Sequence, residues 1–323
     1  LILPGRARDA RPGIFCSLNY LRRSFRVNKS SKSLAQTLNQ EHVAGLVCTS
    51  PFIIGLFAFL LIPMGMSLYY SLCNYSVLST PTFAGFKNYV NAFTADPLFW
   101  TSMKVTFFFA LVSVPLRLVF ALIVALLLQK TSKANAFYRA AYYLPSIIGG
   151  SVAVSILWKR MFATDGVINQ ILGTNYPFLG NTSTAIWTLI LLSIWQFGSS
   201  MLIFLSALKQ IPASLYEAAE IDGANKVRTF FKITLPLLTP TIFFNLVMQM
   251  INGFLAFTQC YIITQGKPMN STLFYTVYMY QQSFEFYNTG YGAALAWIML
   301  MVIGTITAIL FATKKFWVYE GGI

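Results

Sequence analysis

The sequence predicts an all-α integral membrane protein with six transmembrane helices, and three features of its composition indicate this class. Of its 323 residues, 56% are hydrophobic and 10% are charged, whereas soluble globular chains carry about 25% charged residues. The apolar residues gather in long runs, and ~20 such residues are enough to cross a bilayer as a helix. Cationic residues outnumber anionic ones by 23 to 9, which is typical of nucleic-acid binders or of membrane proteins with basic cytoplasmic loops.

Six apolar runs are candidate spans. In chain order they cover about 46–71, 105–128, 140–158, 185–207, 236–258 and 292–313. The third run is the weakest of the six. Pro63, Pro115 and Pro145 lie within spans, where neighbouring helices can satisfy the backbone groups that proline frees.

The runs divide the chain into three predicted parts. These are a basic N-terminal segment (1–45), a membrane domain (46–315) and a short tail (316–323). The first long apolar run begins near residue 46 and is too long for the core of a signal peptide. We therefore expect the N-terminal segment to be a cytoplasmic extension that lies beside anionic lipid.

The cationic residues are distributed unequally between the two sides of the predicted membrane. Segment 1–45, the linkers after the second and fourth runs, and the tail hold 17 of the 23. The other side holds Lys87, Lys104, Lys159, Arg160 and Lys267. By the positive-inside rule the first side is cytoplasmic, which places both termini in the cytoplasm. The net charge of +14 is then a topology signal, and we expect no nucleic-acid partner.

Common sequence patterns of catalysis and metal binding do not occur in the chain. It has no G-x-x-x-x-G-K-[ST] phosphate loop, no G-x-S-x-G nucleophile elbow and no H-E-x-x-H. Its single histidine, His42, and four scattered cysteines form no zinc pattern. None of the nine acids falls within a span, whereas proton- or sodium-driven carriers commonly use intramembrane carboxylates. We expect no catalytic residue, metal site or cofactor in this chain, and an energy source outside it.

The longest internal cytoplasmic segment, 209–235, contains three of the nine acids. Its sequence predicts a short helix that Ser214 can cap and in which Glu217 and Glu220 favour the N-terminal half. Gly223 can end this helix in a left-handed conformation. A second, basic helix over about 224–232 then leads into the fifth span. A solvated helical hairpin would explain these charges without any partner.

This segment closely resembles the EAA loop of ABC-importer permeases. The elements of that motif are present as Glu217-Ala218-Ala219, Asp222-Gly223-Ala224 and Ile233-Thr234-Leu235-Pro236. The resemblance implies the type I importer permease fold, in which residues 214–223 form a coupling helix that docks on a separate ATP-hydrolysing subunit. The expected coupling residues are Ser214, Tyr216, Glu217, Ala218, Ala219, Asp222, Gly223 and Ala224.

Further stretches resemble the sugar-importing branch of these permeases. They include PFIIGLFAFLLIPMGMSLYYSL in the first span and FYRAAYYLPSIIGGSVAVSILWKRMF around the third. The resemblance implies a bacterial inner-membrane subunit that moves an oligosaccharide and itself hydrolyses nothing. Its implied partners are a second homologous permease, two ATP-binding cassette subunits that hold ATP and Mg²⁺, a periplasmic or surface solute-binding protein, and membrane lipid. Two alternatives stay open: import of phosphate, a polyamine or another small solute, and a stand-alone secondary carrier.

Polar residues within the spans are candidates for a substrate path. In and just after the fifth run, Asn245, Gln249, Asn252 and Gln259 fall within ~80° of one another on a helix. In the fourth run, Gln196 follows Trp195. Amides can hydrogen-bond sugar hydroxyls, and an aromatic face can stack on a sugar ring. Alternatively, the amides join this helix to a partner permease.

Arg117 lies about midway through the second span. A charge at that depth costs at least ~2.5 kcal/mol, and the spans of this chain offer no acid to pair with it. Three interpretations stay open. The guanidinium bonds backbone carbonyls or an acid of the partner subunit, or it faces the path and favours an anionic substrate such as a uronate oligosaccharide, or it snorkels to the interface.

Overall fold

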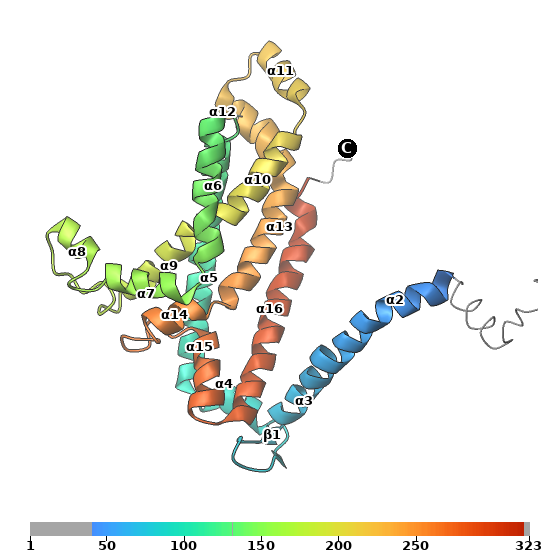
Figure 1. Ribbon diagram of the computed structural model, residues 1–323, viewed down its shortest axis with the longest axis vertical. Helices are drawn as coiled ribbons and strands as arrows, with labels where there is room; N and C mark the ends of the chain where they lie inside the picture. Colours follow the sequence, from blue (N-terminus) through green and yellow to red (C-terminus); the bar gives the residue numbers. More distant parts are fainter. Residues whose placement is uncertain (1–40, 131, 320–323) are drawn as a thin grey trace, which may run out of the picture. The chain divides into compact units, whose positions relative to one another are not determined.

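A computed structural model describes residues 41–130 and 132–319, and the predicted all-α fold is confirmed (Figure 1). The chain divides into two compact units, Leu1–Met66 and Ser67–Ile323. Helix α2 (Glu41–Gly55) of the first unit continues through a π-helical turn, η2 (Leu56–Leu61), into α3 (Ile62–Ser71), in which the boundary between the two units falls. The resulting helix is long and apolar enough to cross a membrane. It matches the predicted first span, whereas most of the predicted N-terminal segment lies outside the described residues.

After α3, the second unit continues with a short hairpin and its longest helix. Strand β1 (Cys73–Asn74) pairs antiparallel with β2 (Thr82–Phe83), and α4 (Lys87–Thr94) follows. Helix α5 (Pro97–Leu127) begins at Asp96, whose carboxylate accepts hydrogen bonds from the backbone N–H groups of Leu98 at 2.9 Å and Phe99 at 3.3 Å. Proline suits the first helical position because it has no N–H to satisfy. The helix therefore begins eight residues before the apolar run that predicted it.

The third and fourth predicted spans are bent pairs rather than straight helices. Helix α6 (Lys133–Ile148) meets α7 (Val152–Met161) at 99°, and α9 (Ala185–Trp195) meets α10 (Gly198–Gln210) at 41°. The first bend falls on a Gly-Gly-Ser sequence, where Ser151 accepts a hydrogen bond from the Val154 N–H and so starts a new helix. The third predicted span is interrupted there because glycine and a serine cap both favour a break.

The remaining helices complete the unit. They are α8 (Val167–Leu172), α11 (Ala213–Ile221), α12 (Lys226–Thr229), η3 (Phe230–Thr234), α13 (Leu235–Phe254), α14 (Thr258–Ile263), α15 (Tyr275–Tyr280), η4 (Gln281–Glu285) and α16 (Thr289–Trp317). In the described part of the chain, four helical runs are long and apolar enough to span a membrane, and each bent pair counted as one span raises this number to six. The predicted membrane fold is thus supported by helix length and composition.

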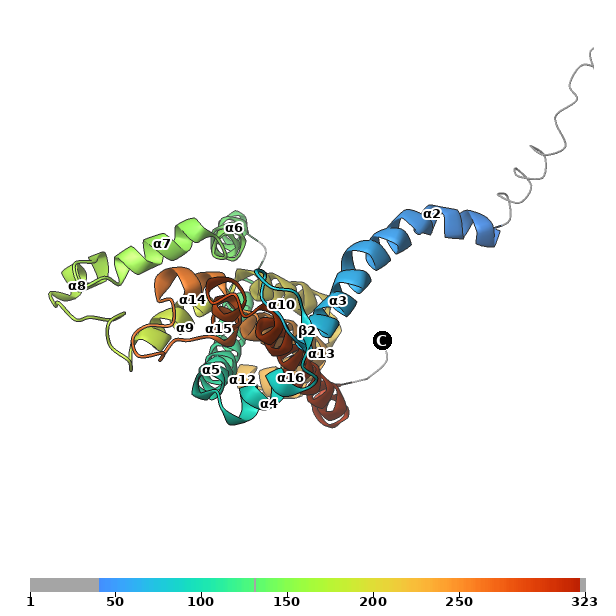
Figure 2. The same ribbon diagram turned by 90° about the horizontal axis from the view of Figure 1, so that it is seen from below.

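Helix α5 lies at the centre of the second unit, packed against α9, α10, α13 and α15. Small side chains allow this close packing, since Ala110, Ala121 and Ala125 are fully buried. Helices α7 and α8 project to one side of this group (Figures 1 and 2).

One end of the second unit is basic. The C-terminal ends of α5, α10 and α16 and the N-terminal ends of α6 and α13 meet there, and α11 lies at its tip (Figure 1). The basic residues of these ends are Lys130, Lys133, Arg139, Lys209, Lys226, Arg228, Lys232, Lys314 and Lys315. Arg139 caps the C-terminal end of α5. Its guanidinium donates two hydrogen bonds, of 2.6 and 3.2 Å, to the carbonyl of the C-cap residue Leu128. These are linker and tail residues that the charge distribution predicts to be cytoplasmic.

Helices α6 and α10 approach closely because residue 198 is glycine. A Cβ atom there would overlap the Tyr142 carbonyl oxygen and lie 2.7 Å from the Tyr143 Cα. We expect Gly198→Ala to reduce the free energy of unfolding by about 1–3 kcal/mol, since backbone atoms cannot move aside as a side chain does. The midpoint of thermal unfolding in detergent measures this. Gly304→Ala is the matched control, because nothing lies within 4 Å of a Cβ at that helical position, and an equal loss there would contradict the packing argument.

Candidate functional site

A polar cavity of 320 Å³ lies inside the second unit. Five of the seven residues predicted for the substrate path line it: Arg117, Gln196, Gln249, Asn252 and Gln259. They come from α5, from the break between α9 and α10, from the end of α13 and from α14. The tertiary structure thus brings together residues that are far apart in the sequence, while their role in transport stays a prediction.

Sequence reasoning missed several residues of this cavity. Ser113, Ser199 and Thr258 contribute hydroxyl groups, and Phe109 and Phe257 contribute aromatic rings. A single hydroxyl within an apolar run carries little information, because it commonly bonds a carbonyl of its own helix. Ser113 could have been identified because it lies one helical turn before Arg117, on the same face of the predicted helix.

The two helix breaks explain why polar residues gather at this place. Irregular backbone at membrane depth is tolerated only where protein or a water-filled cavity satisfies it. At the α9–α10 break, the Gln196 carbonyl accepts hydrogen bonds from Arg117 Nη2 at 2.5 Å and from Ser146 Oγ at 3.0 Å. At the α6–α7 break, the Gly149 carbonyl accepts one from Gln259 Nε2 at 3.1 Å. Arg117 and Gln259 therefore support the broken backbone as well as line the cavity.

The amides of α13 differ in their surroundings. Gln249 is buried and donates to Ser200 Oγ of α10 at 3.0 Å, which joins the two helices within this chain. Asn252 is exposed at the cavity. Asn245 is buried away from it and donates to the Thr241 carbonyl of its own helix at 3.2 Å.

Two features of the predicted path differ in the structure. The four amides do not form a stripe on one helix, since α13 ends at Phe254 and Gln259 belongs to α14. Trp195 does not line the cavity, and its ring lies 6.0 Å from that of Trp158. Gln259 nevertheless lines the cavity, because α14 brings it there from beyond the end of α13.

Arg117 is the charged residue among the cavity-lining side chains. Its bond to the Gln196 carbonyl agrees with the interpretation that the guanidinium bonds backbone carbonyls. Whether Arg117 also meets a substrate stays a prediction. Its Nε atom is buried and has no hydrogen-bond partner, and neither has the buried Oγ of Ser113, one helical turn away. In the ranges 41–130 and 132–319, the ion pair observed is Arg160–Asp165, which is exposed.

The predicted coupling segment forms a helix with a defined C-terminal cap. Helix α11 ends at Ile221, Asp222 is its C-cap, and Gly223 follows with φ +70°. The Gly223 N–H donates to the Glu220 carbonyl at 3.0 Å and the Ala224 N–H to the Ala219 carbonyl at 2.9 Å. These two bonds define a Schellman motif. The prediction of a left-handed glycine at the end of the helix is confirmed.

The start of this helix differs from the prediction. Its N-cap is Pro212, and Ser214 lies inside the helix without a capping hydrogen bond. Proline fixes the extended backbone that precedes the helix, so capping by Ser214 was the wrong expectation. The basic helix expected over 224–232 is divided into α12, which Asn225 caps by accepting from the Arg228 N–H, and η3.

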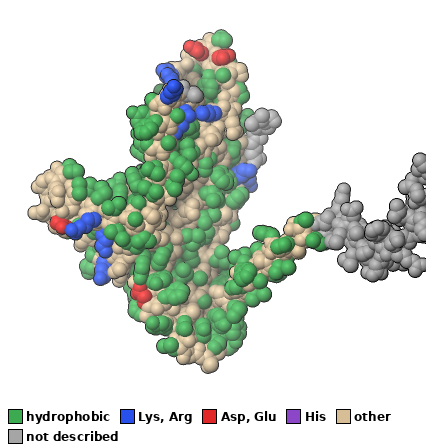
Figure 3. All heavy atoms as spheres, viewed as in Figure 1, with side chains coloured by type: hydrophobic (Ala, Val, Ile, Leu, Met, Phe, Trp, Pro, Cys, Tyr) green, Lys and Arg blue, Asp and Glu red, His purple; other side chains and the backbone are tan. Residues whose placement is uncertain are grey.

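Helix α11 is fixed to the membrane domain on one face and exposed on the other. Tyr216 bonds Thr234 at 3.1 Å, and Ala219 is buried. The exposed side carries the acids Glu217, Glu220 and Asp222 beside exposed Ile221. Acidic side chains mark the tip of the molecule in Figure 3. This face therefore offers both charge and apolar surface to another protein.

At the opposite end of the second unit, Asp96 joins three helices. Besides capping α5, its carboxylate accepts hydrogen bonds from the hydroxyls of Tyr278 in α15 and Tyr291 in α16. Burial raises the pKa of Tyr278, so its hydroxyl keeps the proton that it donates. A polar cavity of 420 Å³ adjoins this cluster, with Asn91 and Gln282 among its lining residues.

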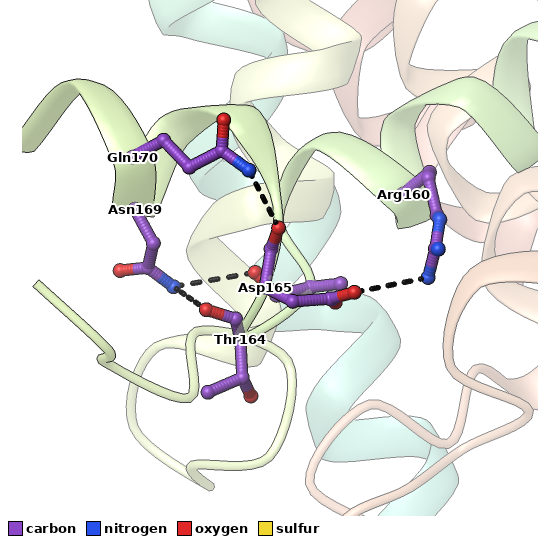
Figure 4. A network of polar contacts seen from close by, with 6 residues as sticks. Arg160, Thr164, Asp165, Asn169 and Gln170 are labelled. Atoms are coloured by element: carbon purple, nitrogen blue, oxygen red, sulfur yellow. Dashed lines mark hydrogen bonds and ion pairs between the residues drawn. The ribbon is translucent and has the colours of Figure 1, made fainter.

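The loop after α7 is organised around one buried amide. Asn169 Nδ2 donates to the carbonyls of Ala163, Thr164 and Tyr176 at 2.8–3.2 Å, and its Oδ1 accepts from the Tyr176 N–H. Figure 4 shows Asn169 beside the exposed Arg160–Asp165 ion pair. The loop is thus an ordered surface rather than a loose connection.

Two broken apolar helices around a polar cavity, with an exposed capped helix at one end, define a membrane transport protein of the permease class. Residues 84–313 match the family described as "Binding-protein-dependent transport system inner membrane component". The chain belongs to this family.

Similar proteins agree with that assignment. The chain is 51% identical over 292 residues to a protein of Bacillus subtilis (strain 168) named probable ABC transporter permease protein YesP, a match that covers 88% of this chain and 94% of that protein. It is 32% identical to AmyD of Thermoanaerobacterium thermosulfurigenes, a probable starch degradation products transport system permease protein, with 82% and 92% covered. A chain of the crystal structure of a bacterial alginate ABC transporter, in complex with an alginate pentasaccharide-bound periplasmic protein, has the same fold, with a TM-score of 0.72, 21% identity, and 83% and 93% covered.

Proposed function

We propose that this chain is a membrane-spanning subunit of an ATP-driven importer that moves an oligosaccharide into the cytoplasm of a bacterium. The observation that carries the proposal is the exposed, glycine-capped α11 at the end of a membrane domain that encloses a polar cavity. The similarity to permeases named for starch degradation products, arabinooligosaccharides and lactose supports a sugar over phosphate or a polyamine.

The energy would come from two partner subunits that bind ATP and Mg²⁺. Helix α11 would dock on one of them through Glu217, Glu220, Asp222 and the exposed Ile221. A short helix whose two ends are fixed by proline and by a Schellman motif moves as a rigid body. The Tyr216–Thr234 bond links it to η3, which continues directly into α13, so a displacement of α11 would reach the cavity-lining end of α13.

The α11 end of the second unit would face the cytoplasm, because basic residues gather there. Both termini would then be cytoplasmic. The opposite end, with Asp96 and the 420 Å³ cavity, would face a solute-binding protein that delivers the sugar. A second, homologous permease would complete the translocation path, as the family's pairing implies.

The cavity would hold part of the oligosaccharide during passage. Its amide and hydroxyl groups can exchange hydrogen bonds with sugar hydroxyls, and the rings of Phe109 and Phe257 offer apolar faces. Cavities that bind small ligands have volumes of about 300–1,000 Å³. The cavity is at the small end of that range, which suits one segment of a chain rather than a long polymer.

The test is substrate-stimulated ATP hydrolysis and uptake by the complete importer in proteoliposomes, measured across a panel of neutral and acidic oligosaccharides, phosphate and polyamines. We expect ATP-dependent uptake of at least one oligosaccharide, and only with the solute-binding protein present. Uptake by this chain alone, without ATPase subunits, would instead identify a secondary carrier. Stimulation by phosphate or a polyamine alone would reject the sugar.

A further inference from the structure

We infer that the imported oligosaccharide carries a carboxylate group and that Arg117 pairs with it in the 320 Å³ cavity. The inference rests on the proposed function and names the class of its substrate: a sugar acid, such as a uronate-containing oligosaccharide.

Charge is the first argument. Arg117 lines the cavity, and no aspartate or glutamate does. The described acids lie elsewhere: Glu41 at the start of α2, Asp96 at the hairpin end, Asp165 in the α7–α8 loop, Glu285 in η4, and the other three on α11 or at its end. A buried cation without a counter-ion is unfavourable, because desolvation is not repaid by a nearby negative charge. The site as built by this chain therefore favours an anion from outside it.

Unsatisfied hydrogen-bonding groups are the second argument. A guanidinium carries five N–H donors, and the bond observed for Arg117 engages Nη2 with the Gln196 carbonyl. Its Nε and the Oγ of Ser113 have no partner either, but both atoms are buried and do not open onto the cavity. A solute would therefore meet the partly exposed remainder of the Arg117 side chain. Residues four apart on a helix share a face, and both line the cavity. A carboxylate has two oxygens and can accept two N–H groups of one guanidinium at once.

The uncharged side chains that line the cavity indicate which other groups the solute has besides the carboxylate. Gln249, Asn252 and Gln259 present amides, and Phe257 presents an aromatic ring. These groups suit the hydroxyls and apolar face of a sugar ring. A single guanidinium balances a single negative charge, as a uronate has, whereas a phosphate monoester would bring up to two. The combination favours a uronate residue.

The depth of Arg117 suits a group that meets the solute inside the membrane. It precedes the last residue of α5 by ten positions, or ~15 Å along the helix. The candidate span Pro97–Leu127 is longer than a ~30 Å hydrocarbon core requires, and Arg117 lies away from both of its ends. An arginine at this depth meets the solute during translocation and not only during its release at the interface.

The experiment compares each uronate di- and trisaccharide with its carboxyl-reduced counterpart, which has the same ring, linkage and length without the charge. Uptake is measured with the complete complex in proteoliposomes. We expect wild-type importer to take up an acidic member, and Arg117→Gln to reduce that uptake at least tenfold while uptake of the reduced partner changes less than threefold. Arg117→Lys keeps the charge and is expected to restore part of the acidic uptake. Every variant is assayed with the same solute-binding protein. A change in the preference for acidic over carboxyl-reduced sugars therefore arises in the permease.

Arg160→Gln is the matched control, since it removes an exposed arginine outside the cavity, and it should leave the preference unchanged. Equal loss of acidic and reduced sugars in Arg117→Gln would overturn the inference while leaving oligosaccharide import intact. Loss of the second permease from the purified Arg117→Gln complex would also overturn it, by identifying an acid of that subunit as the partner. If no oligosaccharide of either kind is imported by the wild type, the proposed function itself fails.

Discussion

Replacing Gly223 with valine is expected to reduce uptake by about tenfold and to lower the amount of sugar imported per ATP hydrolysed. Gly223 adopts φ +70° at the end of α11, and an L-residue in this conformation costs roughly 1–2 kcal/mol. Relief of that strain would open the Schellman motif and change the angle at which α11 docks. A free-energy change of ~1.4 kcal/mol alters an equilibrium tenfold. Uptake and ATP hydrolysis in the same proteoliposomes measure the effect.

Gly85→Val is the matched control for this prediction. Gly85 also has a positive φ, +59°, and nothing lies within 4 Å of a Cβ at either position. Both substitutions therefore introduce backbone strain without a steric clash, but Gly85 precedes α4 at the opposite end of the second unit. Similar losses of coupling in the two variants would mean that α11 has no special part in it.

Replacing Asp96 with alanine is expected to reduce the free energy of unfolding by about 2–4 kcal/mol. The change removes the cap of α5, which costs ~1 kcal/mol. It also leaves the hydroxyls of Tyr278 and Tyr291 without their acceptor, and an unsatisfied buried polar group costs about 1–3 kcal/mol. Because one carboxylate holds α5, α15 and α16 together, the midpoint of thermal unfolding in detergent should fall clearly.

Asp165→Ala provides the comparison. Asp165 also belongs to a loop outside the long helices, but its ion pair with Arg160 is 3.5 Å long and more than two-thirds exposed on both sides. Exposed pairs contribute about 0–1 kcal/mol. If the two aspartate variants unfold at the same temperature, the Asp96 cluster does not stabilise the helix ends as we argue.

The long helices of this protein and the end of α11 could be predicted from its sequence because they depend on local composition. The apolar runs predicted both ends of α16 and the C-terminal end of α5 to within a few residues, whereas α5 begins eight residues earlier than predicted. The Asp-Gly-Ala sequence predicted the end of α11. The direction of the helices could not be predicted where the backbone bends inside an apolar run. Gly149–Ser151 breaks the third span at 99°, and hydropathy responds to side-chain polarity rather than to backbone direction.

The candidate site divides in the same way. Arg117, Gln249 and Asn252 were identified because polar groups are costly in a membrane and so are retained for a reason. Ser113 was missed, and Trp195 and Asn245 do not line the cavity. Asn245 shares the helix face of Gln249 and Asn252 but lies nearer the start of α13. Residues of one helix can be sorted by a 3.6-residue period, but Gln259 reaches the cavity from a different helix.

The sequence by itself determined that this chain is a helical membrane protein with a short, glycine-capped helix before its fifth span, because apolar length and a short motif are local properties. Only the tertiary structure decided which polar residues share a cavity. That outcome depends on two helix breaks, which leave the carbonyls of Gln196 and Gly149 without helical partners. Arg117 donates to the first and Gln259 to the second, so both side chains lie at the cavity. Hydrogen bonds between residues 79 and 110 positions apart have no signature in local sequence.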